Sequence, residues 1–309
     1  MSRLGLPVPR TFLLPAKDNY NIPREVIERF TKDFDLQEIF KKMEGPCYIK
    51  PHDGGGWRNV TLCEDFESLQ QTYSNSNRLV MNIQKAIPFE KYIRCLCIGN
   101  YILPIKYNPD KPYHERYETD EKFLNENEEK KIIDYCKIIN AFHGLEINSV
   151  EFLIKDGVPW LIDFNNPVPD LSVVSLHKFF RWAVCKTVQT VIKYSLWQKP
   201  FPFNLNTEKY LQISANNLLS MEEKEKNYLE LSNIFFAEDA IKELEKETFN
   251  ENYFKLEDEF FNSEEYLEIV KKELGKSFSD ENDPGKFDRF FNEYKGKMGL
   301  SQENSNCKG

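Results

Sequence analysis

Two segments in which apolar strands flank a two-residue turn place the tightest limits on how this chain can fold. Residues 91–107 (KYIRCLCIGNYILPIKY) carry Gly99-Asn100 at their centre, and residues 147–163 (INSVEFLIKDGVPWLID) carry Asp156-Gly157. Glycine next to Asn or Asp supplies the positive φ angles that a tight hairpin turn requires. Both segments are therefore predicted to form β-hairpins.

The rest of the chain alternates between strand and helix patterns. Apolar residues at three- and four-residue spacing predict helices, and short runs rich in β-branched and aromatic residues predict strands. The predicted helices cover 22–43 (two short ones), 65–76, 126–144 and 172–197, and the predicted strands cover 47–50, 57–62 and 78–87. Asp65 is expected to open the second helical segment, and Gly144 is expected to end the third. The pattern predicts an α+β protein, and its 309 residues favour more than one lobe.

The charge of the chain is concentrated at its C-terminal end. The net charge is -9, and residues 211–309 contain 23 acidic and 13 basic side chains. These residues alternate acidic and apolar positions at helical spacing, which predicts an acidic helical extension. Because a basic stripe with interleaved aromatic residues is missing, nucleic acid is not an expected partner. No apolar run approaches the length of a membrane span, so no membrane association is expected either.

Cysteine usage favours a cytoplasmic location. The seven cysteines form no CxxC pair and are odd in number, which argues against a disulfide framework and against a zinc site. The first residues, MSRLGLPVPRTFLLP, lack the apolar core and cleavage site of a signal peptide. Cys95 and Cys97 lie two apart on a predicted strand, and we expect them to pack on one face of it.

Three consecutive glycines, Gly54 to Gly56, follow Lys50 in the segment CYIKPHDGGGWRNV. Glycine weakens an ordinary strand, so the run indicates a sharp bend or a close approach of the backbone to another group. A row of glycine N–H groups can form a nest for phosphate oxygens, with Lys50 adding a positive charge. A hairpin turn that only needs positive φ is the alternative. Neither a P-loop nor a GxGxxG motif occurs in the sequence.

Three oxygen-bearing side chains lie on the second predicted hairpin. Glu151 is on its first strand, and Asp163 and Asn165 are two residues apart on the return strand, so all three can face one side. Magnesium prefers oxygen ligands, and it usually takes one or two carboxylates together with water and substrate phosphates. The hairpin is thus a candidate magnesium site, and a solvated edge strand with ordinary surface acids is the alternative.

Taken in order, three segments resemble the ATP-grasp superfamily. They are CYIKPHDGGGWRNV, NIQKAIPFEKYIRCLCIGNYILPIKY and SVEFLIKDGVPWLIDFNNPVPD, and the resemblance spans about Gly5 to Trp197. It implies a fold of two α+β subdomains that clasp ATP, followed by the helical extension. The implied domains are an N-terminal lid subdomain at 1–86, a C-terminal subdomain with the metal site at 87–205, and the acidic extension at 206–309.

The resemblance also implies roles for individual residues. It implies that Lys50 contacts the ATP phosphates and that the loop of Gly54, Gly55 and Gly56 covers them. It also implies that the adenine contacts Gln84, Lys85 and Ile87, and that the ribose contacts Glu90. It implies that Arg94 stabilises the transferred phosphoryl group or the activated carboxylate, and that Lys106 approaches the substrate. Glu151, Asp163 and Asn165 match the residues that hold Mg2+ in the family.

Most members of this superfamily are ligases, and the resemblance implies an ATP- and Mg2+-dependent carboxylate-amine ligase. A kinase acting on a small-molecule hydroxyl and a non-catalytic ATP-binding regulatory protein are the alternatives. Members usually carry a further domain ahead of GLPVPRT, and the expectation is that this chain lacks it. The expected partners are small-molecule or peptide carboxylates and amines, with either a homodimer or a second protein supplying the missing domain.

Overall fold

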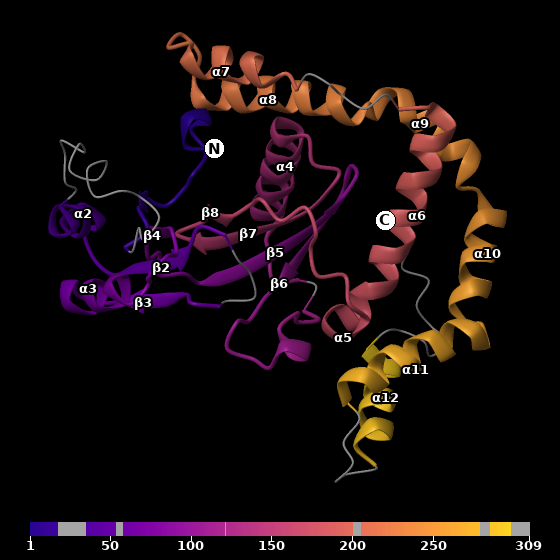
Figure 1. Cartoon of the computed structure of the whole chain (residues 1–309). Coiled ribbons are helices and arrows are strands. Elements are labelled where there is room, and N and C mark those ends of the chain that lie inside the picture. Colours follow the sequence, from indigo (N-terminus) through magenta and orange to yellow (C-terminus); the bar gives the residue numbers. More distant parts are fainter. Residues whose placement is uncertain (18–34, 54–57, 121, 200–204, 279–284, 298–309) are drawn as a thin grey trace. The chain divides into compact units, whose positions relative to one another are not determined.

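The structure is a computed structural model of the chain, and it describes residues 1–309 except 18–34, 54–57, 121, 200–204, 279–284 and 298–309. Its contacts divide the chain into two compact units. Unit 1 contains Met1–Pro7 and Glu90–Gly309, and unit 2 contains Val8–Phe89. The predicted α+β class is confirmed, because each unit holds an antiparallel sheet with helices (Figure 1).

Unit 2 is built on a four-stranded antiparallel sheet of order β1-β4-β2-β3. Its elements are β1 (Thr11–Leu14), α2 (Leu36–Met43), β2 (Cys47–Pro51), β3 (Thr61–Cys63), α3 (Phe66–Ser74) and β4 (Met81–Lys85). One face of the sheet forms the core with both helices, through residues such as Leu14, Ile49, Leu69 and Ile83. The opposite face is the one that carries Lys50 and Gln84, because side chains alternate along each strand.

Capping residues explain where the helices of unit 2 begin. The side chain of Asp65 accepts a hydrogen bond from the Ser68 N–H, and the Ser68 hydroxyl completes a capping box. Asp35 accepts bonds from the first turn of α2 in the same way. The predicted start of the second helical segment is confirmed, while the first of the two short helices expected within 22–43 falls largely outside the described residues. The strand β1 was not predicted, since four residues between prolines offer little alternation to read.

Unit 1 contains the second sheet, of order β6-β5-β7-β8, with every neighbouring pair antiparallel. Its strands are β5 (Lys91–Ile98), β6 (Tyr101–Lys106), β7 (Ile147–Lys155) and β8 (Val158–Asp163). Both predicted hairpins are confirmed, with their turns at Gly99-Asn100 and Asp156-Gly157. Gly99 and Gly157 have φ angles of 56° and 71°, which is the conformation that favours glycine at these positions.

Helix α4 (Glu126–His143) covers the face of this sheet that Cys95 and Cys97 share. Both cysteines are fully buried and lie against Cys136 of the helix. A capping box at Asn125 begins the helix, and Gly144, with φ 69°, ends it. The expected packing role of the cysteines and the expected stop at Gly144 are therefore confirmed.

The helix predicted over 172–197 is interrupted. The structure has α5 (Val173–Leu176), a 3-10 turn η3 (His177–Phe179) and α6 (Phe180–Trp197) in its place. The break occurs at His177, whose φ of 34° and ψ of -103° lie outside the α-helical region. The His177 ring is buried, and its hydrogen bond to the carbonyl of Tyr117 lies outside the helix. A tertiary contact has overridden local helical periodicity here.

The acidic extension is helical, as predicted. It comprises α7 (Thr207–Ala215), α8 (Met221–Phe236), α9 (Glu238–Thr248), α10 (Glu251–Phe261), α11 (Glu264–Phe278) and α12 (Lys286–Lys297). The Tyr135 hydroxyl of α4 donates to Glu225 of α8 at 2.8 Å, and Lys193 of α6 pairs with Glu245 of α9 at 2.5 Å. The Tyr101 hydroxyl of β6 also donates to Glu245, and the Phe142 ring of α4 meets that of Tyr210 on α7 at 5.5 Å. Polar and aromatic contacts together attach the extension to the sheet and to α4 and α6. None of the described helices is both long and apolar enough to cross a membrane.

The two units follow different boundaries from the three expected domains. The chain passes from unit 2 back into unit 1 between Phe89 and Glu90. The helical extension and residues 1–7 both belong to unit 1, together with its sheet. A short 3-10 helix, η1 (Ser2–Leu4), lies in this first segment, and the carbonyl of Pro7 accepts a hydrogen bond from Leu161 N at 2.8 Å. The division at 1–86, 87–205 and 206–309 stays a prediction. A further 3-10 turn, η2 (Tyr113–Glu115), follows β6.

Candidate functional site

Three charged residues form a row across the sheet of unit 1. Arg94 on β5 lies directly opposite Glu151 on β7, and Glu151 lies directly opposite Asp163 on β8. Residues that face each other in an antiparallel pair project from the same side of the sheet. A register irregularity after Glu151 keeps Asp163 beside it. The two hairpins and this irregularity thus place on one face three residues that the family resemblance assigned to the site.

Glu151 is held from two sides. The Tyr92 hydroxyl donates a hydrogen bond to its Oε2, and Arg94 Nε lies 3.5 Å from its Oε1. The Arg94 and Glu151 side chains are only 15% and 13% exposed, so water screens this ion pair weakly. Burial opposes the charge of Arg94, but the Glu151 carboxylate and the neighbouring tyrosines Tyr117, Tyr107 and Tyr92 together outweigh it and raise the pKa of the guanidinium. Burial and the same carboxylate also raise the pKa of Tyr92.

Tyrosine rings surround Arg94. The guanidinium carbon lies 5.4 Å from the centre of the Tyr107 ring and 5.9 Å from that of Tyr117, distances at which cation–π attraction operates. The Tyr107 ring also meets Tyr92 and Tyr117 edge to face, each at 5.2 Å. We did not predict these tyrosines as site residues. Tyr92 lies two residues before Arg94 on the same strand, so alternation alone placed it on the site face.

Asp163 and Asn165 are exposed at the end of β8. The backbone around Asn165 is fixed by the buried side chain of Asn148 on β7. Its Oδ1 accepts a bond from Asn166 N at 2.9 Å, and its Nδ2 donates to Phe164 O at 3.0 Å. The second proton of Nδ2 goes to Asn140 Oδ1 on α4 at 2.8 Å. A side-chain amide therefore continues the strand pairing past Asp163 and fixes the position from which Asn165 projects.

Lys106 is placed apart from Arg94. It lies opposite Ile93 in the register, while Arg94 lies opposite Ile105, so the two basic side chains project from opposite faces of the sheet. The Lys106 ammonium pairs with Glu118 at 3.0 Å and with Asp120 at 3.6 Å. Hydrogen bonds from Lys111, Lys106 and Asn108 lower the pKa of Glu118 to about 2, against the opposing effect of burial. The structure does not bring Lys106 together with the Arg94 row.

Lys50 and Gln84 lie together in unit 2. Lys50 Nζ donates to Gln84 Oε1 at 3.2 Å, and Gln84 Nε2 donates to Thr11 Oγ1 at 3.3 Å on the neighbouring strand. Thr11 and Gln84 face each other in the register of β1 and β4, and both project away from the unit 2 core. The arrangement leaves a half-buried ammonium on the polar face of the sheet.

The other predicted nucleotide contacts have different surroundings. Lys85 is the last residue of β4 and lies opposite Cys47 in the register, so it projects from the core side of the sheet. Its ammonium is 3.4 Å from Glu44. Ile87 is half-buried. Glu90, in unit 1, accepts a bond from Asp156 N at 3.2 Å and lies 3.5 Å from Lys155, so it supports the turn of the second hairpin. Gly54, Gly55 and Gly56 lie outside the described residues.

The donor set of the carboxylate row can be compared with what magnesium requires. Glu151, Asp163 and Asn165 offer only oxygen atoms, with two carboxylates and one amide, which suits a hard divalent cation. No group of three or more His, Cys, Asp or Glu side chains with metal-binding geometry occurs among the described residues. Both oxygens of Glu151 are also engaged by Tyr92 and Arg94. Asp163 and Asn165 thus fit as direct ligands, and Glu151 fits as a third oxygen that remains bound to Arg94.

Comparison with known proteins gives matches in structure only. No family model matches the sequence, and no curated protein sequence matches it. Among solved structures, the chain is similar to D-alanine–D-alanine ligase from Bacillus anthracis in complex with ATP. That match has a TM-score of 0.45 and 19% sequence identity, and it covers 63% of this chain and 62% of the ligase.

Two further matches are of the same kind. A RimK domain ATP-grasp protein from Sphaerobacter thermophilus matches with a TM-score of 0.42 and 13% identity, over 62% of each chain. The D-alanine–D-alanine ligase from Helicobacter pylori matches with a TM-score of 0.38 and 17% identity, over 61% of this chain and 55% of the ligase. In each case the match spans less than two thirds of the relative's length. Because all three TM-scores lie below 0.5, these likenesses say nothing about the activity of this chain. The chain is similar in structure to ATP-grasp ligases, the superfamily that its sequence motifs resemble.

Proposed function

We propose that the chain is an ATP- and Mg2+-dependent ligase that activates a carboxylate as an acyl phosphate and then joins it to an amine. The observation that carries this proposal is the row of Arg94, Glu151 and Asp163 on one sheet face, with Asn165 fixed beside it. A buried, oriented arginine next to an oxygen-rich cation site is the combination that phosphoryl transfer to a carboxylate requires. The resemblance of the sequence motifs supports the same reaction class.

The chemistry explains why both charges are needed. A carboxylate cannot be attacked directly by an amine, because oxide is too poor a leaving group. Transfer of the γ-phosphoryl group from ATP breaks the bond to ADP and forms a bond to a carboxylate oxygen. The amine then attacks the acyl carbon, phosphate leaves, and the amine loses a proton. Negative charge builds on the phosphoryl oxygens in the first step and on the acyl oxygen in the second.

Asp163 and Asn165, with Glu151, are the residues that would hold Mg2+. When bound, the cation supplies positive charge to the phosphate oxygens of the nucleotide. Asn148 contributes by fixing the backbone on both sides of Asn165, so the amide oxygen has a defined position before any ligand arrives. In unit 2, Lys50 would contact phosphate oxygens, and Gln84 orients its ammonium in the absence of nucleotide.

Arg94 would stabilise the developing negative charge. Its position is set by the Glu151 carboxylate and by the rings of Tyr107 and Tyr117, so little reorganisation is needed during the reaction.

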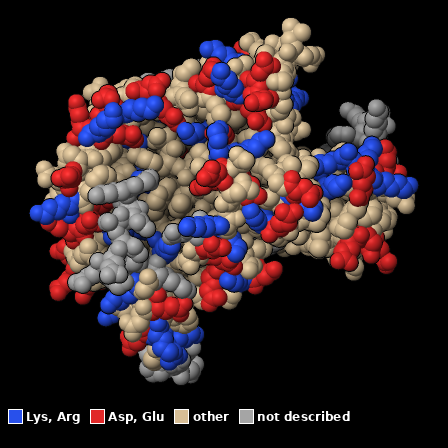
Figure 2. All heavy atoms as spheres, turned by 180° about the vertical axis from the view of Figure 1, so that it is seen from behind, with Lys and Arg blue, Asp and Glu red and all other residues tan. Residues whose placement is uncertain are grey.

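The expected substrates are small molecules or peptides. On the face shown in Figure 2, Lys and Arg side chains lie interspersed with Asp and Glu. This mixed distribution favours small substrates over nucleic acid, which would require a continuous basic surface.

The six described cysteines are all free thiols, which supports the proposed cytoplasmic location.

Release of ADP tests the proposal. The purified chain is incubated with ATP and Mg2+ and with pools of carboxylates, of amines, of both together, and of alcohols, and products are identified by mass spectrometry. A ligase releases ADP fastest when carboxylate and amine are present together, and the product carries a new amide. ADP release with alcohols alone would instead identify a kinase. Nucleotide binding in calorimetry with no turnover in any pool would refute catalysis and identify an ATP-binding protein.

A further inference from the structure

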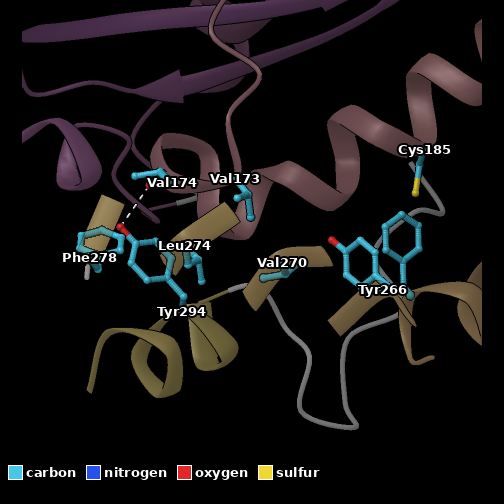
Figure 3. Close-up of a cluster of buried hydrophobic side chains, with 9 residues drawn as sticks. Val173, Val174, Cys185, Tyr266, Val270, Leu274, Phe278 and Tyr294 are labelled. Carbon is cyan, nitrogen blue, oxygen red and sulfur yellow. Dashed lines mark hydrogen bonds between the residues drawn. The ribbon is translucent and has the colours of Figure 1, made fainter. Parts of the chain in front are cut away.

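The last two helices of the extension share a core with the segment that follows β8. Figure 3 shows Val173 and Val174 of α5 beside Leu274 and Phe278 of α11 and Tyr294 of α12, all of them buried. The same cluster includes Cys185 of α6 and Tyr266 of α11. The pair α11–α12 is therefore packed into unit 1 by apolar side chains.

Tyr294 connects two separate parts of the chain around the candidate site. Its ring is fully buried, and its hydroxyl lies 3.1 Å from the carbonyl of Val174 and 3.3 Å from the carbonyl of His114 (Figure 3 shows the first of these bonds). One hydroxyl proton can serve either acceptor. Val174 belongs to α5 and His114 to η2, so the hydroxyl of a single residue of the extension lies within hydrogen-bonding distance of the backbones of both segments.

The η2 turn is also attached to the tail through its side chain. The His114 ring meets Phe278 of α11 at 5.2 Å and Phe290 of α12 at 5.6 Å, in both cases edge to face. Phe278 and Phe290 themselves stack at 4.3 Å. Aromatic contacts of this geometry stabilise beyond the area they bury. Three residues of the tail thus fix the position of His114.

His177 extends these contacts toward Arg94. Its ring lies 6.1 Å from that of Tyr294, and its Nε2 donates to the carbonyl of Tyr117 at 2.9 Å. Its Nδ1 accepts a bond from Lys178 N at 2.8 Å, so one tautomer, with the proton on Nε2, satisfies both bonds. The positive φ of His177 is an unfavourable conformation that the surrounding contacts maintain.

The other ends of these contacts lie in the candidate site. The Tyr117 ring faces the Arg94 guanidinium, and the backbone of Tyr117 pairs with that of Tyr107. On η2, the Tyr113 hydroxyl donates to Asp170 Oδ2 at 2.6 Å, just before α5. The segment from Tyr107 to Glu118 therefore supplies the two tyrosine rings that lie nearest to the Arg94 guanidinium. Helix α12 contacts the same segment at His114.

We propose that α11 and α12 position the substrate-activating arginine, with Tyr294 as the positioning residue that acts through the 107–118 segment. This inference rests on the proposed function, in which Arg94 stabilises the transferred phosphoryl group. It assigns a role to the part of the extension that packs on α5 and η2. If the extension only added stability, the fold would be the same. Loss of the Tyr294 hydroxyl would then not change the mobility of residues 107–118 specifically.

Two matched variants separate these roles. Tyr294→Phe removes the hydroxyl between α5 and η2 and keeps the ring. Tyr210→Phe is the control, because Tyr210 is 1% exposed and its hydroxyl bonds Ser232 at 3.1 Å between α7 and α8. Hydrogen exchange is measured by mass spectrometry on the unliganded protein, in peptides that contain the amides of Asn108, Glu115 and Glu118. These amides bond carbonyls within or next to the segment.

The expected result is a three- to tenfold faster exchange, roughly the worth of one hydrogen bond, in the 107–118 peptides of Tyr294→Phe and no change there in Tyr210→Phe. We expect ADP release in the carboxylate and amine pool to fall by about the same factor in Tyr294→Phe, with the KM for ATP unchanged. Equal exchange in the two variants would overturn the inference. So would faster exchange combined with wild-type turnover. A wild-type protein that releases no ADP in any pool would count against the proposed function, whereas the exchange result stands apart from it.

Discussion

The polar faces of the two sheets hold their charged residues in different ways. In unit 1, the Arg94 guanidinium is ion-paired, lies between tyrosine rings and is largely buried. In unit 2, Lys50 is only half-buried, and its bond to Gln84 is to a neutral amide. A charge that must stabilise a transition state works best when it is already in position. A lysine that contacts flexible phosphates can instead adjust as the ligand binds, because its ammonium has no fixed plane.

The largest expected effect comes from the carboxylate row. Asp163→Asn removes the exposed carboxylate next to Glu151 and should reduce ADP release by at least about a thousandfold, since a cation in such a site contributes several kcal/mol. The melting temperature should change by no more than about 2 °C, because an exposed side chain contributes little to packing. Asp156→Asn, at the exposed turn of the same hairpin, is the matched control and should keep wild-type activity. Turnover in Asp163→Asn equal to that of this control would refute the metal assignment.

Arg94 tests whether the row is fixed by mutual pairing. Arg94→Gln leaves the buried Glu151 carboxylate without its cation and should lower the unfolding free energy by about 3 kcal/mol. Turnover should fall about a hundredfold or more, which is the order of magnitude expected when one donor that stabilises transition-state charge is removed. The double variant Arg94→Gln/Glu151→Gln should regain much of the stability and none of the activity. Denaturant titration of the wild type, Arg94→Gln, Glu151→Gln and the double variant gives the coupling free energy. Additive losses in the double variant would show that the two side chains are not energetically coupled.

Lys50 tests the other half of the comparison. Lys50→Met should weaken ATP binding about tenfold, as expected for loss of one charged hydrogen bond to phosphate, and should leave stability nearly unchanged. Lys85→Met is the informative control, because the Lys85 ammonium lies beside Glu44 on the core side of the sheet. Calorimetry with ATP and Mg2+ measures both variants. If Lys85→Met weakened binding more than Lys50→Met, the assignment of the phosphate contact to Lys50 would be wrong.

The smallest effect concerns Glu118, which pairs with Lys106 and Lys111 on the face away from Arg94. Its pKa is lowered to about 2, so its pairing stabilises the protein fully above the usual pKa of about 4.5 and is lost as the pH falls from there to about 2. Glu118→Gln should therefore destabilise by about 1 kcal/mol at pH 7, discounted because both lysines are partly exposed. The difference from wild type should shrink below pH 4.5. A difference that stays constant with pH would exclude this electrostatic origin.

Local signals were enough to predict both hairpins. Counting from the turns pairs Phe152 with Leu161, but an irregularity beside Glu151, which no local signal predicts, is needed to bring Asp163 rather than Ile162 opposite Glu151. The same counting also places Lys106 opposite Ile93, and therefore on the other face from Arg94. The position of Lys106 on the other face could therefore have been predicted from the turn, whereas matching family motifs takes no account of which face of a strand a residue occupies.

Other features depend on tertiary contacts that no local pattern encodes. The helix break at His177 requires the carbonyl of Tyr117, sixty residues earlier, and the fixing of Asn165 requires a buried amide on a neighbouring strand. The role of Tyr294 requires both η2 and α5 to be in place. Periodicity predicted that the extension is helical, but which of its helices approach the site follows from packing alone.

Residues Met1–Pro7 belong to unit 1 although unit 2 follows them directly in the chain. Unit 2 ends at Phe89, so its residues are synthesised well before β8 and α7, which hold the partners of Pro7 and Arg3. Pro7 can bond Leu161, and Arg3 can bond Ser214, only once most of the chain has been synthesised. Completion of unit 1 is thus a later event in biosynthesis than synthesis of the residues of unit 2.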